Sequence, residues 1–264
     1  MRMASIASGS SGNSIYLGSD KTHILIDAGI SNKRIECGLS ELGIKADELS
    51  ALLITHEHSD HIKGLKVFLK KHRIPVYASP GSLEEIRRMG LAEGFEDLLI
   101  PISSECRTKI GDLTVKPFRV DHDAREPFAY RVSSGERAVA VATDLGHYTE
   151  EIVEHLRNLD AVLVEANHDI RMLEAGPYPY HLKRRILSDF GHLSNESAGK
   201  LLCRIFHQGL KKIFLGHLSS ENNYPSLAYE AVKCELSYLA GFSSAGDIPI
   251  EVAKREQLSG VVNL

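Results

Sequence analysis

The chain has 264 residues, of which 43% are hydrophobic and 25% are charged, a composition typical of a globular protein with a large buried core. Its longest apolar runs, such as 138–142, have the length of a strand and fall far short of the ~20 residues that cross a membrane as a helix. With 31 basic and 35 acidic residues the net charge is −4, so no overall positive charge attracts nucleic acid or an anionic membrane, and any phosphate has to be bound locally.

Short β-rich runs alternate with helical patterns along the chain. Apolar and β-branched runs predict strands at 14–18, 23–27, 51–55, 75–78, 113–120, 128–132, 138–143, 161–165 and 212–215. Apolar residues at helical spacing predict helices at 33–42, 60–71, 83–89, 150–157, 182–188, 195–207 and 226–239. This alternation favours an α/β fold. Because no internal repeat or linker-like segment interrupts it, we expect a single domain over residues 1–264.

A glycine- and serine-rich loop, Gly9 to Asn13, precedes the first predicted strand. It lacks the Lys-Ser/Thr ending of a nucleotide-binding P-loop, so we do not expect it to bind ATP. We interpret it as a tight hairpin loop near the functional site.

The densest cluster of potential metal ligands follows the predicted strand at 51–55. His56 and His58 alternate by two, so in an extended segment both imidazoles project to one side and can share a metal ion. Asp60 and His61 fall in the turn that opens the predicted helix at 60–71 and can face a second ion. The alternative is a polar loop that is rich in histidine by chance, which this spacing disfavours.

Ligand-type residues also follow three later predicted strands. They are His122 after 113–120, Asp144 after 138–143 and His217 after 212–215. Each alone is more often an ordinary polar residue, but residues at strand ends can converge on one edge of a sheet. Histidine and carboxylate ligands with open coordination are typical of a hydrolytic site, whereas a closed structural site is rich in cysteine.

The chain carries a set of short motifs beyond these single residues. HxHxDH at 56–61 is typical of one hydrolase superfamily, and Glu165-Ala-Asn-His168 and two Gly-His-Leu-Ser segments, at 191–194 and 216–219, narrow the match. The full set lies at 7–14, 25–29, 54–64, 121–124, 142–146, 165–169, 176–179, 191–195 and 215–223. In these motifs the chain resembles the metallo-β-lactamase-fold hydrolases, and in particular their YycJ/WalJ-like branch.

The resemblance implies a metallo-β-lactamase fold, a four-layer αββα sandwich with a dinuclear metal site at the sheet edges. It also implies two divalent metal ions, zinc or manganese with iron also compatible, which share a hydroxide that attacks a phosphodiester. Asp60 is counted among the catalytic residues as well as among the ligands. The implied ligands are His56, His58 and His122 for the first ion, Asp60, His61 and His217 for the second, and Asp144 as the bridge.

Three further residues are expected beside the ligands. Asp27, at a strand end near Gly29, matches the superfamily's short acidic motif and is expected to orient residues of the metal loop. His192 precedes a predicted helix N-terminus, which favours an anion, and the resemblance implies that it contacts the phosphate or protonates the leaving oxygen. His168 matches the branch motif, and its partner stays open between metal, phosphate and neighbouring residues.

Two groups of cations flank these motifs. We expect both to hold phosphates on either side of the cut without reading sequence, the alternative being ordinary solvated helix faces. Tyr178 and Tyr180 could stack bases nearby or only stiffen a loop. The two groups are Lys63, Lys66 and Lys70 on the predicted helix at 60–71, and Lys183, Arg184 and Arg185 ahead of His192.

The motifs favour nucleic acid as the substrate. The metals alone permit hydrolysis of esters, thioesters, lactones, β-lactams or phosphodiesters. A thioester or lactone hydrolase has no obvious need for His192 or for two groups of cations. The branch resemblance implies a compact 5′-to-3′ DNA exonuclease of the kind that serves DNA repair. A ribonuclease stays open because no residue visibly reads a 2′-hydroxyl, and a metal-binding regulatory protein without turnover is a third class.

The N-terminus and the cysteines indicate the compartment. A Gly/Ser stretch stands where a signal peptide would have its apolar core, and the four cysteines are far apart in the chain. We therefore expect reduced thiols and a cytoplasmic protein. The sequence predicts neither the oligomeric state nor a protein partner.

Overall fold

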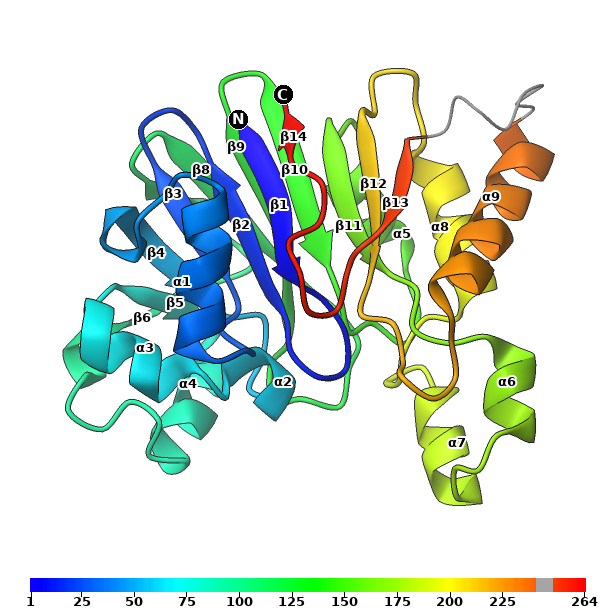
Figure 1. Cartoon of the computed structure of the whole chain (residues 1–264), viewed down its shortest axis with the longest axis horizontal. Coiled ribbons are helices and arrows are strands. Elements are labelled where there is room, and N and C mark those ends of the chain that lie inside the picture. Colours follow the sequence, from blue (N-terminus) through cyan, green and yellow to red (C-terminus); the bar gives the residue numbers. More distant parts are fainter. Residues whose placement is uncertain (241–248) are drawn as a thin grey trace.

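The computed structural model describes residues 1–240 and 249–264, and it has two seven-stranded sheets packed face to face with helices on their outer faces (Figure 1). The predicted αββα sandwich is confirmed. The first sheet has the order β14-β1-β2-β3-β4-β5-β6. Its strands are β1 (Arg2–Ala7), β2 (Ser14–Gly18), β3 (His23–Ile26), β4 (Leu49–Leu53), β5 (Val76–Ala78), β6 (Leu99–Pro101) and β14 (Val262–Asn263).

The second sheet has the order β13-β12-β11-β10-β9-β8-β7. Strands β10 to β13 are parallel to one another, so their carboxyl ends share one edge of the sheet. β3 to β6 are parallel in the first sheet, and their ends share an edge in the same way. The strands of the second sheet are β7 (Thr108–Ile110), β8 (Leu113–Arg119), β9 (Phe128–Ser134), β10 (Arg137–Ala142), β11 (Ala161–Glu165), β12 (Lys212–Gly216) and β13 (Ile250–Val252).

Three apolar layers hold the sandwich together. The middle layer lies between the sheets and contains large buried side chains such as Phe128, Tyr130 and Phe214. One outer layer packs α1 (Asn32–Glu41), α3 (Leu65–His72) and α4 (Pro80–Arg88) on the first sheet, and the other packs α5 (Glu150–Leu156), α8 (Asn195–Ile205) and α9 (Pro225–Ala240) on the second. β10 and β11 are buried on both faces, which explains their nearly continuous apolar sequences.

Shorter helices complete the chain near the carboxyl ends of the central strands. These are α2 (Ser59–Ile62), α6 (Ile170–Ala175) and α7 (Tyr180–Ile186), with the 3-10 turns Ala46–Glu48 and Glu96–Leu98 elsewhere. In Figure 1, α6 and α7 project from the body of the molecule on the side of α8 and α9. None of the helices in the described part of the chain combines the length and hydropathy that a membrane crossing requires.

The predicted helix at 60–71 is confirmed for most of its length, but the structure divides it into α2 and α3. The break falls at Lys63 and Gly64, where the Gly64 N–H donates to the Ala28 carbonyl at 2.8 Å. A Cβ atom at Gly64 would lie 2.0 Å from the Ile30 carbonyl oxygen, so the break lets this turn pack against the chain that follows β3. The other predicted strands and helices appear with ends shifted by a few residues, and the single domain stays a prediction.

Candidate metal centre

The predicted ligands come together at the carboxyl ends of the strands, and both sheets of the sandwich contribute to the group. His56, His58, Asp60 and His61 follow β4 of the first sheet, while the other predicted ligands follow β8, β10 and β12 of the second. Their nitrogen and oxygen atoms form three groups, each with all ligand atoms within 4.8 Å of one another. The groups are His56, His58 and His122; Asp60, His61 and His217; and His56, His61 and Asp144.

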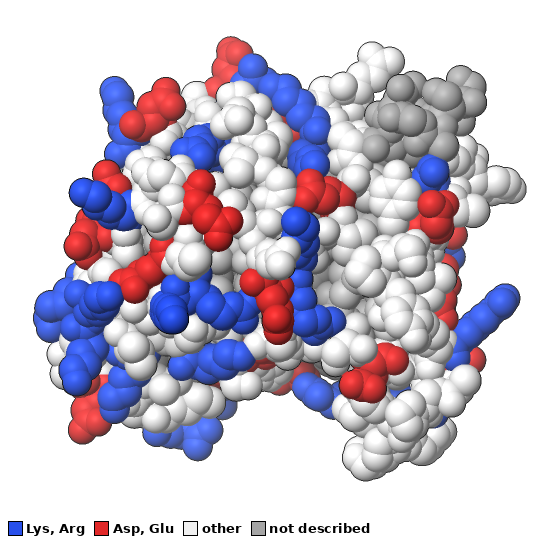
Figure 2. Space-filling model, in the orientation of Figure 1, with Lys and Arg blue, Asp and Glu red and all other residues white. Residues whose placement is uncertain are grey.

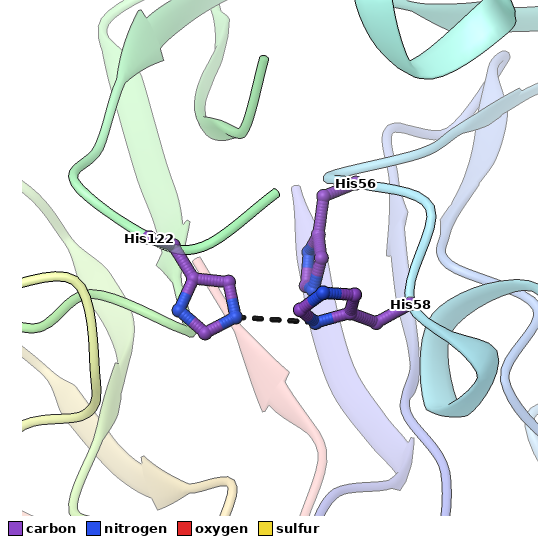
Figure 3. A group of neighbouring side chains, drawn as sticks. All are labelled: His56, His58 and His122. Atoms are coloured by element: carbon purple, nitrogen blue, oxygen red, sulfur yellow. Dashed lines mark hydrogen bonds between the residues drawn. The ribbon is translucent and has the colours of Figure 1, made fainter. Parts of the chain in front are cut away.

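The first group is shown in Figure 3, in which His56 and His58 project from one loop and His122 faces them from another. His122 Nε2 lies 3.2 Å from His58 Nδ1. His56 Nε2 is buried and has no hydrogen-bond partner among the described residues. Burial, reinforced by the neighbouring His61, holds the pKa of His56 well below its ordinary value, so its imidazole is neutral. A buried, neutral and unpartnered imidazole nitrogen fits a metal ligand.

The second group lies around Asp60. Asp60 Oδ2 is 3.1 Å from His217 Nε2 and 3.5 Å from His61 Nε2. Asp144 lies between the two groups, with Oδ2 3.1 Å from His61 Nε2 and Oδ1 3.8 Å from His122 Nε2. Asp144 is therefore close to members of both groups.

The buried carboxylates of this centre favour the binding of a cation. Burial alone would lower the pKa of His217, but Asp144, Asp60 and Glu165 reverse this and raise it to about 10. Burial likewise opposes a charged His61, yet Asp144, Asp27 and Asp60 raise its pKa well above the ordinary value. Buried carboxylates therefore impose positive charge on the histidines around them. A divalent ion would supply the same charge and leave both imidazoles neutral, so the residues fit a metal.

Hydrogen bonds to the second ring nitrogen orient three of the predicted ligand histidines. His61 Nδ1 lies 2.7 Å from Asp27 Oδ2, His217 Nδ1 lies 2.8 Å from Glu165 Oε1, and His122 Nδ1 lies 3.0 Å from the Gly191 carbonyl oxygen. An acceptor at Nδ1 keeps the proton there and leaves Nε2 free to face an ion. The geometry therefore fixes the tautomer that metal binding requires.

Asp27 is buried below the ligands, where its carboxylate also accepts bonds from the Thr55 N–H at 2.8 Å and the Thr55 hydroxyl. This contact ties the end of β3 to the loop that carries HxHxDH. Gly29 follows two residues after Asp27. A Cβ atom there would lie 1.6 Å from the Asp60 carbonyl oxygen, so this position requires glycine. The expected place of Asp27 behind the metal loop agrees with these contacts.

Backbone strain marks three residues of the centre. Asp27, Asp144 and His217 have φ angles of 63°, 57° and 53°, in the left-handed region that residues other than glycine rarely adopt. Each lies just beyond the end of a strand. Such strain persists where the surroundings fix the residue, and it concentrates at functional sites.

Glu165 is the residue to which the sequence motifs assigned no role. It ends β11 and is fully buried, and its Oε1 contacts His192 Nδ1 at 2.7 Å as well as His217. Burial would raise its pKa, but His192 and His217 lower it to about 2. In the sequence, the indication of a role was the position of Glu165 at the end of an apolar strand. The neighbouring strands β10 and β12 are followed by the predicted ligands Asp144 and His217.

His192 lies beside both ligand groups. Its ring centroid is 5.0 Å from that of His122 and 5.3 Å from that of His217. It lines a hollow of about 240 Å³ together with Asp60 and Asp144. Burial opposes the charged imidazole, yet Glu165 and then Asp144 raise its pKa above the ordinary value. Ser194 caps the following helix, since its hydroxyl accepts from the Ser197 N–H at 3.1 Å.

His168 is buried, but neither of its ring nitrogens has a hydrogen-bond partner among the described residues. Burial lowers its pKa to about 4. Its contribution to the site is through the backbone, because the His168 carbonyl accepts from the Asn195 N–H at 2.9 Å and so positions the segment after His192. The structure does not link its side chain to a predicted ligand.

The predicted cations differ in where they lie and in what they contact. Arg185 contacts Asp123 and lines the same hollow as His192, so it lies at the centre, whereas Lys63 donates to the Ser11 carbonyl. Lys66 instead pairs with Glu93 at 3.2 Å. Lys63 lies in the turn before α3, whereas Lys66 and Lys70 lie on α3 itself, so the three are not on one continuous helix. Lys183 and Arg184, on α7, line a neighbouring hollow with Tyr180.

The glycine- and serine-rich loop is a hairpin between β1 and β2, as predicted. Asn13 Nδ2 lies 3.1 Å from His61 Nε2, and the Asn13 N–H donates to the Asp60 carbonyl at 2.8 Å. The loop therefore forms one wall of the centre.

Residues 22–210 match the family model of the beta-lactamase superfamily domain. The chain is 40% identical over 236 residues to a protein named exodeoxyribonuclease WalJ of Streptococcus pneumoniae serotype 2, covering 88% of this chain and 87% of that one. It is 38% identical over 227 residues to exodeoxyribonuclease YycJ of Bacillus anthracis, covering 86% of each. The crystal structure of Zn²⁺-bound PqqB from Methylobacterium extorquens superimposes with a TM-score of 0.74 over 100% of both chains at 17% identity, which shows the shared fold.

Proposed function

The chain belongs to the beta-lactamase superfamily, and we propose that it is a metal-dependent nuclease that removes nucleotides from the 5′ end of DNA. The observation that carries this proposal is the convergence of the predicted ligands into two adjoining groups that share Asp144. Two relatives of almost the same length bear the name exodeoxyribonuclease, which supports DNA as the substrate.

The ligand groups would hold two divalent ions, zinc or manganese. The first ion would be held by the three histidines of Figure 3, and the second by Asp60, His61 and His217. Bound there, the ions would supply Lewis-acid activation of a water molecule and of the scissile phosphate. The protein's own contribution is a rigid ligand set whose outer nitrogens are already held by Asp27, Glu165 and a backbone carbonyl.

His192 would serve the leaving oxygen. Its Nδ1 is held by Glu165, which leaves Nε2 as the atom able to donate, and the neighbouring Glu165 and Asp144 raise its pKa. A general acid of this kind contributes about 10²–10⁴-fold to the rate. His192 is therefore proposed as the proton donor, and Glu165 as the residue that positions it.

His192→Ala tests this role through the leaving group. The variant should lose about 10²–10⁴-fold in rate on DNA, whose leaving alkoxide needs a proton, and far less on bis(p-nitrophenyl) phosphate, whose leaving group does not. Steady-state rates on both substrates give the comparison. Equal losses on the two substrates would contradict a proton donor and leave His192 as a positioning residue.

The substrate is proposed to be held locally, since the surface charge is mixed. Figure 2 shows Lys and Arg interspersed with Asp and Glu on the side of α1, α3 and α4, and fewer charged side chains on the side of α8 and α9. Arg185 is the predicted cation that lines the hollow at the centre, and Lys63 contacts the glycine- and serine-rich loop. Contacts of this kind bind the phosphate backbone without reading sequence.

A cleavage assay tests the proposed function. The substrates are 3′-labelled, 5′-phosphorylated duplex DNA, single-stranded DNA and single-stranded RNA, each with manganese, zinc or chelator. We expect metal-dependent progressive shortening of DNA from the 5′ end, and none with the double variant Asp60→Ala, His61→Ala. Shortening of RNA alone would change the substrate class, and hydrolysis of thioesters or lactones with no strand cleavage would overturn the nuclease.

A further inference from the structure

A second hollow, of about 330 Å³, adjoins the metal centre. Its walls are the loop after β12, the start of α9 and the segment after β13. Ser219 lines both this hollow and the one that contains His192. The volume is within the range of sites that bind small ligands, about 300–1,000 Å³. A molecule in the second hollow is therefore placed next to the reacting groups.

Arg255 stands at the boundary between the two hollows. One terminal nitrogen of its guanidinium lies 3.2 Å from the Ser10 hydroxyl, and the other donates to the Leu218 carbonyl at 2.9 Å. Ser10 lines the hollow at the metal centre, whereas Arg255 itself lines the second one. Among the described residues, the hydrogen-bond partners of this guanidinium are the neutral Ser10 hydroxyl and Leu218 carbonyl, and no carboxylate oxygen of that part of the chain lies within 4.0 Å of it.

The other side chains that line the second hollow are of the types that bind a nucleotide. Tyr224 is 60% exposed and lines the second hollow, and an aromatic ring there is of the kind on which a base stacks. Lys254 adds a second cation, and Ser220 adds a hydroxyl. A guanidinium matches phosphate oxygens through parallel N–H bonds, which makes it the usual partner of a terminal phosphate.

We propose that this second hollow binds the terminal nucleotide of the strand, with Arg255 on its 5′-phosphate and Tyr224 against its base. The proposal rests on the nuclease function proposed above. The cations decide which end is bound, because a 5′-phosphate carries charge and a 3′-hydroxyl carries none. The rest of the strand then passes through the hollow at the metal centre, which Tyr178 and Arg185 also line.

The test compares 3′-labelled single-stranded DNA with a 5′-phosphate or a 5′-hydroxyl. The wild type should prefer the phosphate by about tenfold or more in kcat/KM, and Arg255→Ala should bring this ratio close to one. Arg255→Lys should keep part of the preference, and Tyr224→Ala should raise KM on both substrates with the ratio kept. Arg107→Ala, in a hollow formed by β8, β9 and β10, is the matched control and should keep the wild-type ratio. A wild-type ratio in Arg255→Ala would overturn the proposal, and the ratio cancels any loss of folded or metal-loaded protein.

A binding experiment separates this proposal from the nuclease function. Thymidine 5′-monophosphate, thymidine and inorganic phosphate are titrated into the full chain in the presence of chelator, so that no metal binds the phosphate. The monophosphate should bind more tightly than either of the others, and Arg255→Ala should weaken it by about tenfold or more. Equal binding of the monophosphate to wild type and Arg255→Ala would overturn the site, even if the wild type cleaves DNA.

Discussion

Asp27 shows how one buried side chain sets the geometry of the centre. It fixes the ring of His61 and the backbone of Thr55 from a strained position at the end of β3. Partners of this kind keep a ligand in the tautomer and orientation that the ion needs, and their loss typically costs 10–100-fold in metal affinity.

Asp27→Asn should therefore weaken metal binding at the second ligand group by about 10–100-fold. Asparagine has the same shape and tolerates a positive φ, so the backbone should be retained. Competition with a chromophoric chelator measures the two affinities. Asp97→Asn, in the surface pair with Arg73, is the matched control, and an unchanged affinity in Asp27→Asn would contradict the assignment.

At this scale the sequence predicts the ligands and Asp27, but it does not predict the other residues that act through a ligand. HxHxDH is a local pattern, and the other ligands follow recognisable strands. Glu165 lies in a motif at the end of a predicted strand and Arg255 in none, but for both the partners are distant in the chain and are met only after folding. The ring of His168 shows the opposite case, a motif residue whose side chain has no described partner.

Among the elements, α7 carries three consecutive cations beside the centre. Lys183 and Arg184 line a hollow with Tyr180, next to the part of α7 that faces Asp123. If both contact the phosphates of a strand, they contribute about 0.7 each to the slope of log affinity against log salt.

The double variant Lys183→Ala, Arg184→Ala should lower that slope by about 1.4 for single-stranded DNA. Fluorescence anisotropy over a range of salt concentrations, with chelator to prevent cleavage, gives the measurement. Lys66→Ala serves as the control because Lys66 pairs with Glu93. An unchanged slope in the double variant would show that α7 is an ordinary solvated face.

Asp160 ties the starts of the central strands together, far from the ligands. Its carboxylate accepts from the Ala138 N–H at 2.9 Å and from Arg137 at 2.7 Å. Partial burial would raise its pKa, but these bonds lower it below the ordinary value. A lowered pKa stabilises the fold above pH ~4, and this contribution is lost as the pH falls through the lower, folded value.

Asp160→Asn should thus lower the free energy of unfolding by about 1–2 kcal/mol at pH 7. The difference from wild type should shrink at acid pH, as the pH falls through the lowered pKa of the folded-state carboxylate. Urea denaturation at pH 7 and at acid pH measures this difference in the free energy of unfolding. A difference that stays constant with pH would contradict the role of the charge.

The elements show where local pattern stops being sufficient. The apolar runs of β10, β11 and β12 predicted those strands well because both of their faces are buried. The break between α2 and α3 could not be predicted, since it depends on a close approach between Gly64 and the chain after β3. The short strands β6 and β7 have too few residues to show a period.

On the scale of the whole molecule, the metal centre joins the two halves of the sandwich. The first sheet supplies the HxHxDH loop, and the second supplies His122, Asp144 and His217. An ion held by both halves binds the folded chain and not the unfolded one, so binding stabilises the fold by about 2.7 kcal/mol at 100 times the dissociation constant. The cytoplasmic location and the role in DNA repair stay predictions at this scale.

The central claim is that this centre holds the metal on which the nuclease depends. The most direct measurement strips the protein with chelator and follows the DNA cleavage rate as manganese or zinc is returned in known equivalents per chain. We predict no cleavage without metal and a rise to a plateau at two equivalents, with no recovery in the Asp60→Ala, His61→Ala variant. Full activity of the stripped protein, or equal recovery in the variant, would contradict the account.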